Sequence, residues 1–208
     1  MTPAENFDLS AVQRRRKRAL GVSLALPTVA LLFTQSLWVV DGPAHLSIEW
    51  IGLALIVVCI LGRTWCALYL GGKKKRELVR HGPYSVVRNP LYVFSAIGAA
   101  GVGLCAGSLV IGMIFGAACV AIFDLVIRKE EVYLAGQFGA SYGDYRAQVP
   151  RWLPDFSLWR DVERIEGQPR LILLTFRDAL VFLGAFPILE SFEELQATGY
   201  LPVWLYLP

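Results

Sequence analysis

The chain alternates long apolar runs with short clusters of charged residues, glycine and proline. Residues 19–40 are 22 consecutive positions without a charged side chain. At about 1.5 Å per helical residue, this length crosses a hydrocarbon core of roughly 30 Å. A second run covers residues 46–70, and Arg63 is the one charged residue well inside it. Both runs predict transmembrane helices.

The third apolar run, residues 91–127, is too long for one crossing. Its 37 residues contain one charged side chain, Asp124, and would extend about 55 Å as a straight helix, nearly two bilayer cores. We therefore expect the chain to fold back within residues 103–108, where two glycines permit a tight turn. Gly112 and Gly116 have the GxxxG spacing that lets a neighbouring helix pack closely. A flat surface for a substrate is the alternative use of these glycines.

The C-terminal part contains a further run, residues 171–189, which has the length of a span but carries Arg177 and Asp178 near its middle. Inserting two such charges into the membrane costs about 5–7 kcal/mol, whereas insertion of the apolar residues is favourable by roughly 4–7 kcal/mol. The segment is therefore either a membrane helix whose charges pair within the bundle or an interfacial helix. We adopt the membrane helix, followed by residues 199–208 as an interfacial anchor containing tryptophan and tyrosine.

Composition places the whole chain in the membrane class. Hydrophobic residues make up 55% of the 208 residues and charged residues only 18%, which excludes an ordinary soluble domain. No internal repeat or long linker divides the chain, so residues 1–208 form one predicted domain, with its motifs in residues 46–154 and a C-terminal extension at 155–208. The predicted fold is an all-α, polytopic membrane helical bundle with four or five transmembrane helices.

Lysine and arginine predict the orientation of the bundle. Basic residues cluster on one side of the predicted spans, at 14–18, 73–76 and 128–129, whereas the connections at 41–45 and 103–108 contain none. The positive-inside rule therefore places the N-terminus, residues 80–93 and the segment after Ile127 in the cytoplasm. The first cluster would also contact anionic headgroups, which makes membrane lipids the expected partners rather than nucleic acid.

The four cysteines all lie in or beside apolar runs, at Cys59, Cys66, Cys105 and Cys119. The chain contains no CxxC pattern and only two histidines. This distribution is typical of small packing residues and indicates neither a zinc site nor a disulfide framework. The sequence therefore predicts no metal ligands.

Two polar segments interrupt the apolar pattern on the predicted cytoplasmic side. The first covers residues 81–92 and reads HGPYSVVRNPLY; the second covers residues 130–154 and reads EEVYLAGQFGASYGDYRAQVPRWLP. In the second segment, Glu131 and Leu134 share one helix face, and Gly139 is the predicted helix end. Irregular backbone beside a membrane is tolerated where protein or a cavity satisfies its polar groups, so the two segments indicate a site.

These segments resemble the paired signatures of the isoprenylcysteine carboxyl methyltransferase family and its prokaryotic relatives. The first matches GPYxxxR(H/N)PxY and the second matches EExxLxxxFGxxYxxYxxxVPRxxP. The resemblance covers roughly residues 46–154 and implies a membrane-embedded enzyme that holds S-adenosylmethionine on the cytoplasmic side. It also implies a lipophilic methyl acceptor that enters from the bilayer. Asn89 replaces the histidine usual in eukaryotic members, and Phe94 replaces a common small residue; both differences concern the acceptor more than the cofactor.

The resemblance and the chemistry of the cofactor together indicate which residues would bind it. The candidates are His81, Gly82, Pro83, Tyr84, Arg88, Asn89, Pro90, Tyr92, Glu130, Glu131, Leu134, Tyr142 and Tyr145. Backbone groups beside glycine and proline can bind the amino-acid end and the ribose, while tyrosines offer aromatic surface to adenine or the sulfonium. Glu131 is the candidate for the ammonium because it faces inward, whereas Glu130 lies about 100° round the helix. An internal ion pair of Glu131 with Arg88 or Arg151 is the alternative.

The reaction itself would be an in-line displacement, which needs alignment and a dry site rather than covalent help. The candidate catalytic residues are Arg151 and Glu131, and the candidate substrate-binding residues are Arg63, Arg151 and Trp152. Arg151 would orient an acceptor carboxylate by a bidentate contact, and no base is then needed. Arg63 is either a functional intramembrane cation or a side chain that snorkels to the interface. Asp124 and Arg128 form an expected helix pair.

The predicted function is transfer of a methyl group from S-adenosylmethionine to a lipophilic acceptor, most simply the carboxylate of an isoprenylcysteine-type molecule. Methylation of a phospholipid amine or a thiol is the first alternative, and either acceptor would need a glutamate or tyrosine as base. A nicotinamide-dependent membrane reductase and a non-enzymatic lipid-binding protein are alternatives from other classes. The sequence predicts no oligomeric state.

Overall fold

The computed structural model describes residues 32–40, 42–71 and 77–208. Its four long helices are α2 (Pro43–Leu70), α4 (Pro90–Leu104), α5 (Leu109–Phe138) and α7 (Pro169–Ala197). The shorter elements are α3 (Pro83–Val86), α6 (Ala140–Gln148), the 3-10 helix η2 (Phe156–Leu158) and the strands β1 (Thr34–Ser36) and β2 (Leu205–Leu207). The described chain is mostly helical, which confirms the all-α fold.

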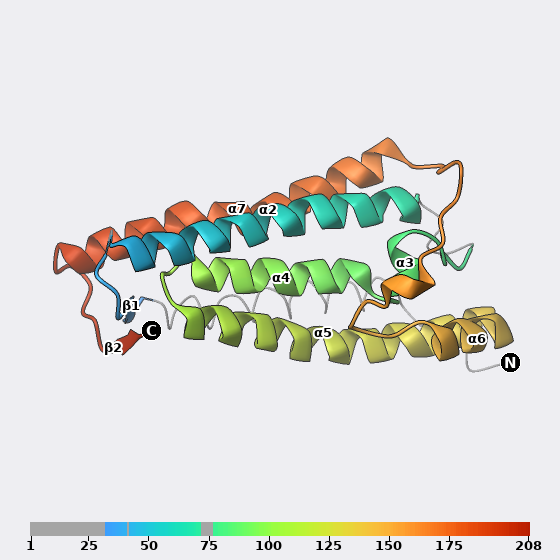
Figure 1. Cartoon of the computed structure of the whole chain (residues 1–208), viewed down its shortest axis with the longest axis horizontal. Coiled ribbons are helices and arrows are strands. Elements are labelled where there is room, and N and C mark those ends of the chain that lie inside the picture. Colours follow the sequence, from blue (N-terminus) through green and yellow to red (C-terminus); the bar gives the residue numbers. More distant parts are fainter. Residues whose placement is uncertain (1–31, 41, 72–76) are drawn as a thin grey trace, which may run out of the picture.

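The long helices form an elongated bundle with α4 at its centre (Figure 1). Helix α4 packs against both α2 and α5, and α7 packs against α2. Elements α3, α6 and η2 gather at one end of the bundle, whereas β1 and β2 lie at the other (Figure 1). Helices α2, α5 and α7 are each long and apolar enough to cross a membrane, while the 15 residues of α4 extend about 22 Å. The chain is therefore a multi-pass membrane bundle.

The first predicted span is described only at its end. Residues 19–31 lie outside the described residues, and residues 32–40 contain β1 rather than a helix. Strand β1 pairs in parallel with β2, with Thr34 opposite Leu205. The prediction of a helix that reaches residue 40 is therefore wrong. The backbone of residues 34–36 forms its hydrogen bonds with β2, from the far end of the chain, instead of within a helix. A hydropathy pattern does not report such a long-range partner.

The second predicted span is confirmed by α2, which begins three residues earlier than expected, at Pro43. Buried cysteines pack against glycines of the neighbouring helix. A Cβ on Gly98 would lie 2.5 Å from Cys59 Sγ, and a Cβ on Gly52 would lie 2.9 Å from Cys105 Sγ. These contacts agree with the predicted packing role of the cysteines.

The hairpin of α4 and α5 confirms the predicted fold-back. Its turn lies between Leu104 and Leu109, and Gly107 adopts a φ of 63°, which favours glycine. Ser108 is the N-cap of α5, and its hydroxyl accepts a hydrogen bond from the backbone N–H of Ile111. The turn therefore has local sequence signals on both sides.

Glycines let α4 and α5 approach closely. A Cβ on Gly103 would lie 2.7 Å from the Cα of Gly112, and a Cβ on Gly116 would lie 3.2 Å from the Cβ of Ala100. Even a methyl group would press against the facing helix at these positions. The predicted packing role is therefore confirmed, and α4 covers the surface that the alternative assigned to a substrate.

Helix α5 continues beyond its apolar run as far as Phe138. Gly139 ends it with a φ of 53° and is followed at once by α6. Residues 149–154 then have no regular secondary structure, as their two prolines predict. The helix extension and its end are both confirmed.

The C-terminal run of residues 171–189 lies within α7, which packs along α2. Arg177 and Asp178 pair with each other at 3.6 Å, and their side chains are 72% and 57% exposed. The expectation that the bundle would pair these charges is therefore wrong, because the two neighbours lie on the outer surface. Residues 205–207 form β2, so the predicted interfacial anchor also closes the end of the bundle.

Candidate functional site

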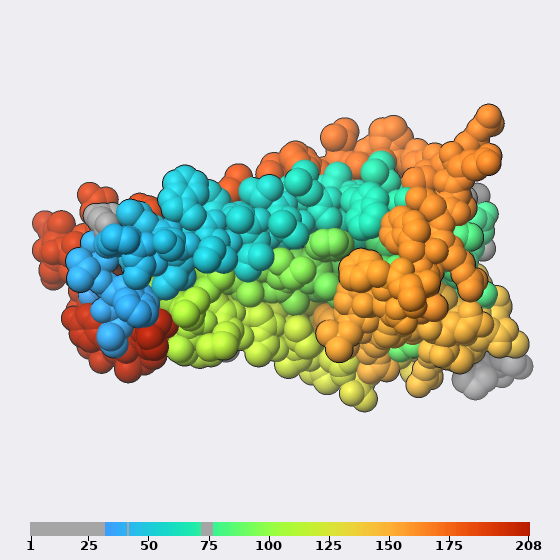
Figure 2. Space-filling model, viewed as in Figure 1, coloured from blue at the N-terminus to red at the C-terminus, as the bar shows by residue number. Residues whose placement is uncertain are grey.

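The two polar segments of the sequence meet at one end of the bundle. The backbone N–H of Arg88 donates to the carbonyl of Pro150 at 2.8 Å, and the N–H of Asp155 donates to the carbonyl of Val86 at 2.9 Å. Residues between α6 and α7 cover the same end of the molecule (Figure 2). The predicted convergence is therefore confirmed, and main-chain hydrogen bonds maintain it.

Gly82 determines the bend of the first segment. Its φ of 58° favours glycine, and a Cβ there would lie 2.2 Å from the ring of Tyr69 in α2. Pro83 then begins α3, and Pro90 begins α4. These three candidate residues are buried and shape the backbone, but they do not line the pocket that the bend creates.

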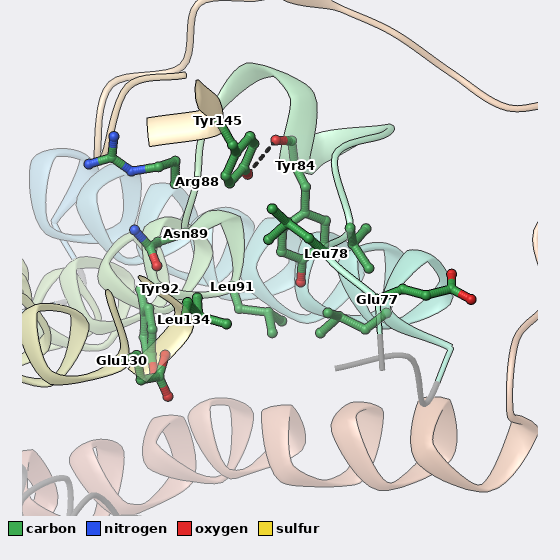
Figure 3. A pocket seen from close by; sticks show the side chains of 12 residues that line it. Glu77, Leu78, Tyr84, Arg88, Asn89, Leu91, Tyr92, Glu130, Leu134 and Tyr145 are labelled. Carbon is green, nitrogen blue, oxygen red and sulfur yellow. Dashed lines mark hydrogen bonds between the residues drawn. The ribbon is translucent and has the colours of Figure 1, made fainter. Parts of the chain in front are cut away.

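A pocket of about 90 Å³ lies where this bend meets α2, α5 and α6 (Figure 3). Seven candidate cofactor residues line it: Tyr84, Arg88, Asn89, Tyr92, Glu130, Leu134 and Tyr145. Five residues that the sequence did not indicate complete the wall: Leu70, Glu77, Leu78, Val79 and Leu91. The wall is therefore mostly aromatic and aliphatic, with two carboxylates, one guanidinium and one amide.

Most of the missed wall residues lie next to the basic run at residues 73–76. That run was interpreted only as a topology signal. Leu78 and Val79 follow it closely and come only a few positions before Tyr84. The abrupt change from charged to apolar residues beside a motif was the signal available for finding them.

Three tyrosines lie in α3 and α6, and two of them, Tyr84 and Tyr145, line the pocket. The hydroxyl of Tyr145 donates to the backbone carbonyl of Tyr84 at 2.7 Å (Figure 3), and Tyr142 packs beside Tyr145. Among the described residues, the buried hydroxyl of Tyr84 has no hydrogen-bond partner. Burial raises the pKa of Tyr84 and of Tyr145, and it raises the pKa of Tyr142 to about 12. All three phenols are therefore neutral hydrogen-bond donors at physiological pH.

Glu131 lies behind the pocket wall, where two arginines bind it. Its Oε1 accepts from Arg88 Nη2 at 3.0 Å, and its Oε1 and Oε2 accept from Arg151 Nε and Nη2 at 3.1 and 2.6 Å. The side chain is 7% exposed, so its predicted inward direction is confirmed. Both internal ion pairs, which were the alternative to a ligand contact, are present together. Glu130, by contrast, lines the pocket.

Asp124 is a second anchor for Arg151, two helical turns before Glu131 in α5. Its Oδ2 accepts from Arg128 Nε at 2.6 Å, which confirms the predicted helix pair. Its Oδ1 accepts from Arg151 Nη1 and from Trp152 Nε1, each at 3.2 Å. Arg151 therefore bridges two carboxylates, and its hydrogen bonds to Glu131 raise its pKa.

Arg88 connects these ion pairs with the pocket. Its Nη1 donates to the backbone carbonyls of Arg146 and Val149 at 2.6 and 2.9 Å, and its Nη2 donates to Glu131. Among the described residues, its buried Nε has no hydrogen-bond partner. Because Arg88 also lines the pocket, this N–H is a donor that the described protein groups do not use.

Several candidate residues lie outside the pocket wall. His81 is exposed, and Tyr142 packs behind Tyr145. The indole N–H of Trp152 donates to Asp124. Arg63 is half-buried within the bundle, where its Nη1 donates to Ser95 Oγ on α4. The described contact of Arg63 therefore links α2 to α4, and its proposed role toward a substrate stays a prediction.

Comparison with known families identifies the region that contains these features. A model of the phospholipid methyltransferase family matches residues 48–141, from α2 to the start of α6. This range includes all of the first polar segment and the Glu130–Glu131 pair of the second. No solved structure matches the chain.

Three relatives match with different coverage. The cobalt-zinc-cadmium resistance protein CzcN of Cupriavidus metallidurans is 33% identical over 192 residues, which cover 90% of this chain and 86% of that protein. The nickel-cobalt-cadmium resistance protein NccN of Alcaligenes xylosoxydans xylosoxydans is 30% identical over 207 residues, covering 100% and 94%. The protein-S-isoprenylcysteine O-methyltransferase of Schizosaccharomyces pombe is 38% identical over 81 residues, covering 39% and 34%.

Proposed function

Because the chain belongs to the phospholipid methyltransferase family of membrane proteins, we propose that it transfers a methyl group from S-adenosylmethionine to a lipophilic acceptor, most simply an isoprenylcysteine-type carboxylate. Membership makes the chain a membrane methyltransferase; the cofactor, the acceptor and the residue roles are the proposed parts. The observation that carries the proposal is the pocket whose wall comes from both polar motifs. Such a wall supports binding of a polar methyl donor beside an apolar methyl acceptor.

The pocket residues fit the chemistry of S-adenosylmethionine. The bound cofactor would supply a methyl group on a sulfonium cation. Glu130 and Glu77 offer carboxylates to its ammonium, and the Tyr84 hydroxyl and Arg88 Nε offer unused donors to its polar atoms. Tyrosine rings offer surface to adenine or the cation. The pocket volume of about 90 Å³ is below the roughly 300 Å³ of typical ligand pockets, so part of the cofactor would lie in the open mouth.

We assign the ammonium contact to Glu130 rather than Glu131. Glu130 lines the pocket, whereas both oxygens of Glu131 accept hydrogen bonds from arginine. Removing Glu131 would leave the buried Arg88 without its carboxylate and Arg151 with Asp124 alone. Glu131 therefore positions Arg88 beside the pocket. This assignment replaces the sequence-based choice of Glu131 as the residue that binds the ammonium.

Arg151 holds the second motif against α5. Its Nη1 contact with Asp124 is longer than its Nη2 contact with Glu131, and Asp124 is more exposed than Glu131. An acceptor carboxylate could therefore replace Asp124 on Arg151 while Glu131 keeps the guanidinium in place. We therefore keep the proposal that Arg151 orients the acceptor carboxylate. Trp152 lies next to Arg151 and would contact the same acceptor.

The acceptor determines whether a base is needed. A carboxylate and a sulfonium carry opposite charges that partly cancel in the transition state, so alignment in a dry site promotes the reaction without proton transfer. An amine or thiol would have to lose a proton, and Glu130 or Glu77 is then the candidate base. The relative named protein-S-isoprenylcysteine O-methyltransferase matches 39% of this chain, and its name supports the carboxylate acceptor.

We also propose that the pocket faces the cytoplasm. Its end of the bundle carries Arg80, Arg128, Lys129 and Arg146, whereas residues 32–40, 105–108 and 198–208 at the other end contain no lysine or arginine. The positive-inside rule places the basic end in the cytoplasm. The cofactor would then enter from the cytosol and the acceptor from the inner leaflet.

Two measurements test the proposed function. Calorimetric titration of the detergent-solubilised protein with S-adenosylmethionine and with NADPH separates methyl transfer from a reductase, and binding of neither would favour a lipid-binding protein. Incubation with methyl-labelled S-adenosylmethionine and a farnesylcysteine analogue, phosphatidylethanolamine or a lipophilic thiol then identifies the acceptor. We expect label in the carboxyl methyl ester; label only in the amine or thiol would replace that acceptor, and NADPH binding alone would overturn the proposal.

A further inference from the structure

A second cluster of polar side chains lies at the end of the bundle opposite the pocket. Within the described residues, His45 and Glu49 at the start of α2 meet Glu193 near the end of α7 (Figure 1). His45 Nδ1 lies 3.8 Å from Glu49 Oε2, and His45 Nε2 lies 3.5 Å from Glu193 Oε1. One ligand atom from each residue lies within 4.8 Å of the other two.

The fold creates this cluster by packing two helices and a turn around one imidazole. His45 and Glu49 are four residues apart and so share a face of α2, against which α7 packs. A Cβ on Gly107 would lie 2.2 Å from the His45 ring, so the turn between α4 and α5 closes over it. Ser36 Oγ donates to the carbonyl of Gly107 at 2.8 Å, which ties β1 to the same turn.

Burial makes the charge state of the cluster important. His45 is 1% exposed and Glu49 is 8% exposed, and the side chain of Glu193 is 18% exposed. Buried carboxylates are costly unless a positive group accompanies them. A proton on the imidazole and a bound metal cation are two ways to supply such a charge.

The donor set favours a transition metal among cations. One imidazole nitrogen with two carboxylate oxygens is a ligand set of the kind that binds Zn²⁺ and related divalent ions and leaves an open coordination position. Calcium and magnesium prefer oxygen ligands alone. Metal–ligand distances of about 2.0–2.2 Å place neighbouring tetrahedral ligand atoms roughly 3.3–3.6 Å apart. Only one imidazole nitrogen can bind the ion, so the carboxylate beside the other nitrogen would have to turn toward it. The three ligand atoms lie within 4.8 Å of one another, which is at most about 1 Å beyond that spacing.

We propose that His45, Glu49 and Glu193 form a binding site for a divalent transition-metal ion. The sequence pattern predicted no metal site because it offered no CxxC or histidine pair, and Glu193 is far from the other two ligands in the chain. The site is separate from the methyl-transfer pocket and lies at the other end of the bundle (Figure 1). It does not depend on the proposed cofactor or acceptor.

Cobalt titration tests the site directly. The chelator-washed protein, purified without a polyhistidine tag, should bind one Co²⁺ per chain and develop visible absorption bands, which Zn²⁺ then removes. His45→Gln should abolish the bands, and Glu193→Gln should weaken the affinity by more than about tenfold. His81→Gln changes the only other histidine of the chain and should bind as the wild type does.

A folding control keeps the result interpretable. Glu193 is the most exposed ligand of the three, so Glu193→Gln should retain wild-type helicity by circular dichroism. Zn²⁺ should raise the Tm of the wild type and of His81→Gln but not of Glu193→Gln. Absence of cobalt bands in the wild type would overturn the proposal. Unchanged bands in His45→Gln would overturn it as well.

Discussion

Arg151 binds Glu131 through two hydrogen bonds, from Nη2 to Oε2 at 2.6 Å and from Nε to Oε1 at 3.1 Å. The arginine side chain is 25% exposed and that of the glutamate only 7%. A largely buried bidentate contact depends on shape as well as charge. Substitutions that keep the charge but change the shape should therefore be detectable.

Replacing Arg151 with lysine should lower both stability and turnover. Lysine keeps the charge but cannot reproduce the planar fork, so Glu131 loses a charge-assisted hydrogen bond worth about 1.5–3 kcal/mol. Thermal unfolding in detergent measures the first effect, and methyl transfer measures the second. Arg164→Lys, at an exposed position, is the matched control and should resemble the wild type. Wild-type stability of Arg151→Lys would contradict the structural role.

The two adjacent glutamates should respond differently to the same change. Glu130→Gln should weaken binding of S-adenosylhomocysteine by about tenfold, or roughly 1.4 kcal/mol, since Glu130 lines the pocket. Glu131→Gln should instead cost about 3–5 kcal/mol of stability, because the buried Arg88 loses its carboxylate and Arg151 keeps only Asp124. Calorimetry and thermal unfolding on both variants separate the effects. The opposite assignment would follow if Glu131→Gln folded normally but lost the ligand.

The hydroxyl of Tyr84 should contribute to binding and not to folding. It is buried without a hydrogen-bond partner among the described residues, so Tyr84→Phe should keep or slightly raise the Tm and weaken cofactor binding. Tyr145→Phe removes a 2.7 Å hydrogen bond and should cost about 0.5–1.5 kcal/mol of stability. Equal ligand affinities of wild type and Tyr84→Phe would remove that hydroxyl from the proposed site.

Alkaline pH should destabilise the folded chain through Tyr142. Burial raises its pKa to about 12, compared with about 10 in an unfolded chain. Below about pH 10 both states keep the proton, and the contribution to stability is fully present. Between about pH 10 and 12 only the unfolded state loses it, so the free energy of unfolding falls. Denaturant titrations at graded pH measure the decline, which Tyr142→Phe should make shallower; an identical slope in that variant would refute the assignment.

Cysteine labelling should distinguish the two ends of the bundle. His81 lies at the pocket end and Val39, which is 81% exposed, lies at the β1 end. In a cysteine-free background, an impermeant maleimide added to intact cells should label Val39→Cys but not His81→Cys. Both should react after detergent treatment, which is the control for accessibility. The reverse pattern in intact cells would overturn the proposed orientation.

Local patterns were sufficient for most helices. The run at residues 46–70 corresponds to α2, and the glycines near residue 105 correspond to the turn between α4 and α5. The inward face of Glu131 followed from helical periodicity alone. These features depend on residues that are close together in the chain, and a single sequence reports them directly.

Long-range contacts account for what local patterns missed. The segment at residues 32–40 is apolar enough for a helix, yet it pairs with β2 because the C-terminus returns to the same end of the bundle. Periodicity favoured Glu131 as a ligand residue, whereas Arg88 and Arg151 already bind it. Only the folded chain shows that two arginines bind Glu131 and that Glu130 lines the pocket.

By itself, the sequence determined that this chain is a membrane helical bundle with two polar motifs of a methyltransferase family, because span length, charge placement and motif spacing are properties of the linear chain. Tertiary structure alone decided that Glu130, and not Glu131, lines the pocket. It also brought His45 next to Glu193 from the other end of the chain. Such neighbours arise from helix packing, whose partners and register are set by contacts summed over the whole fold.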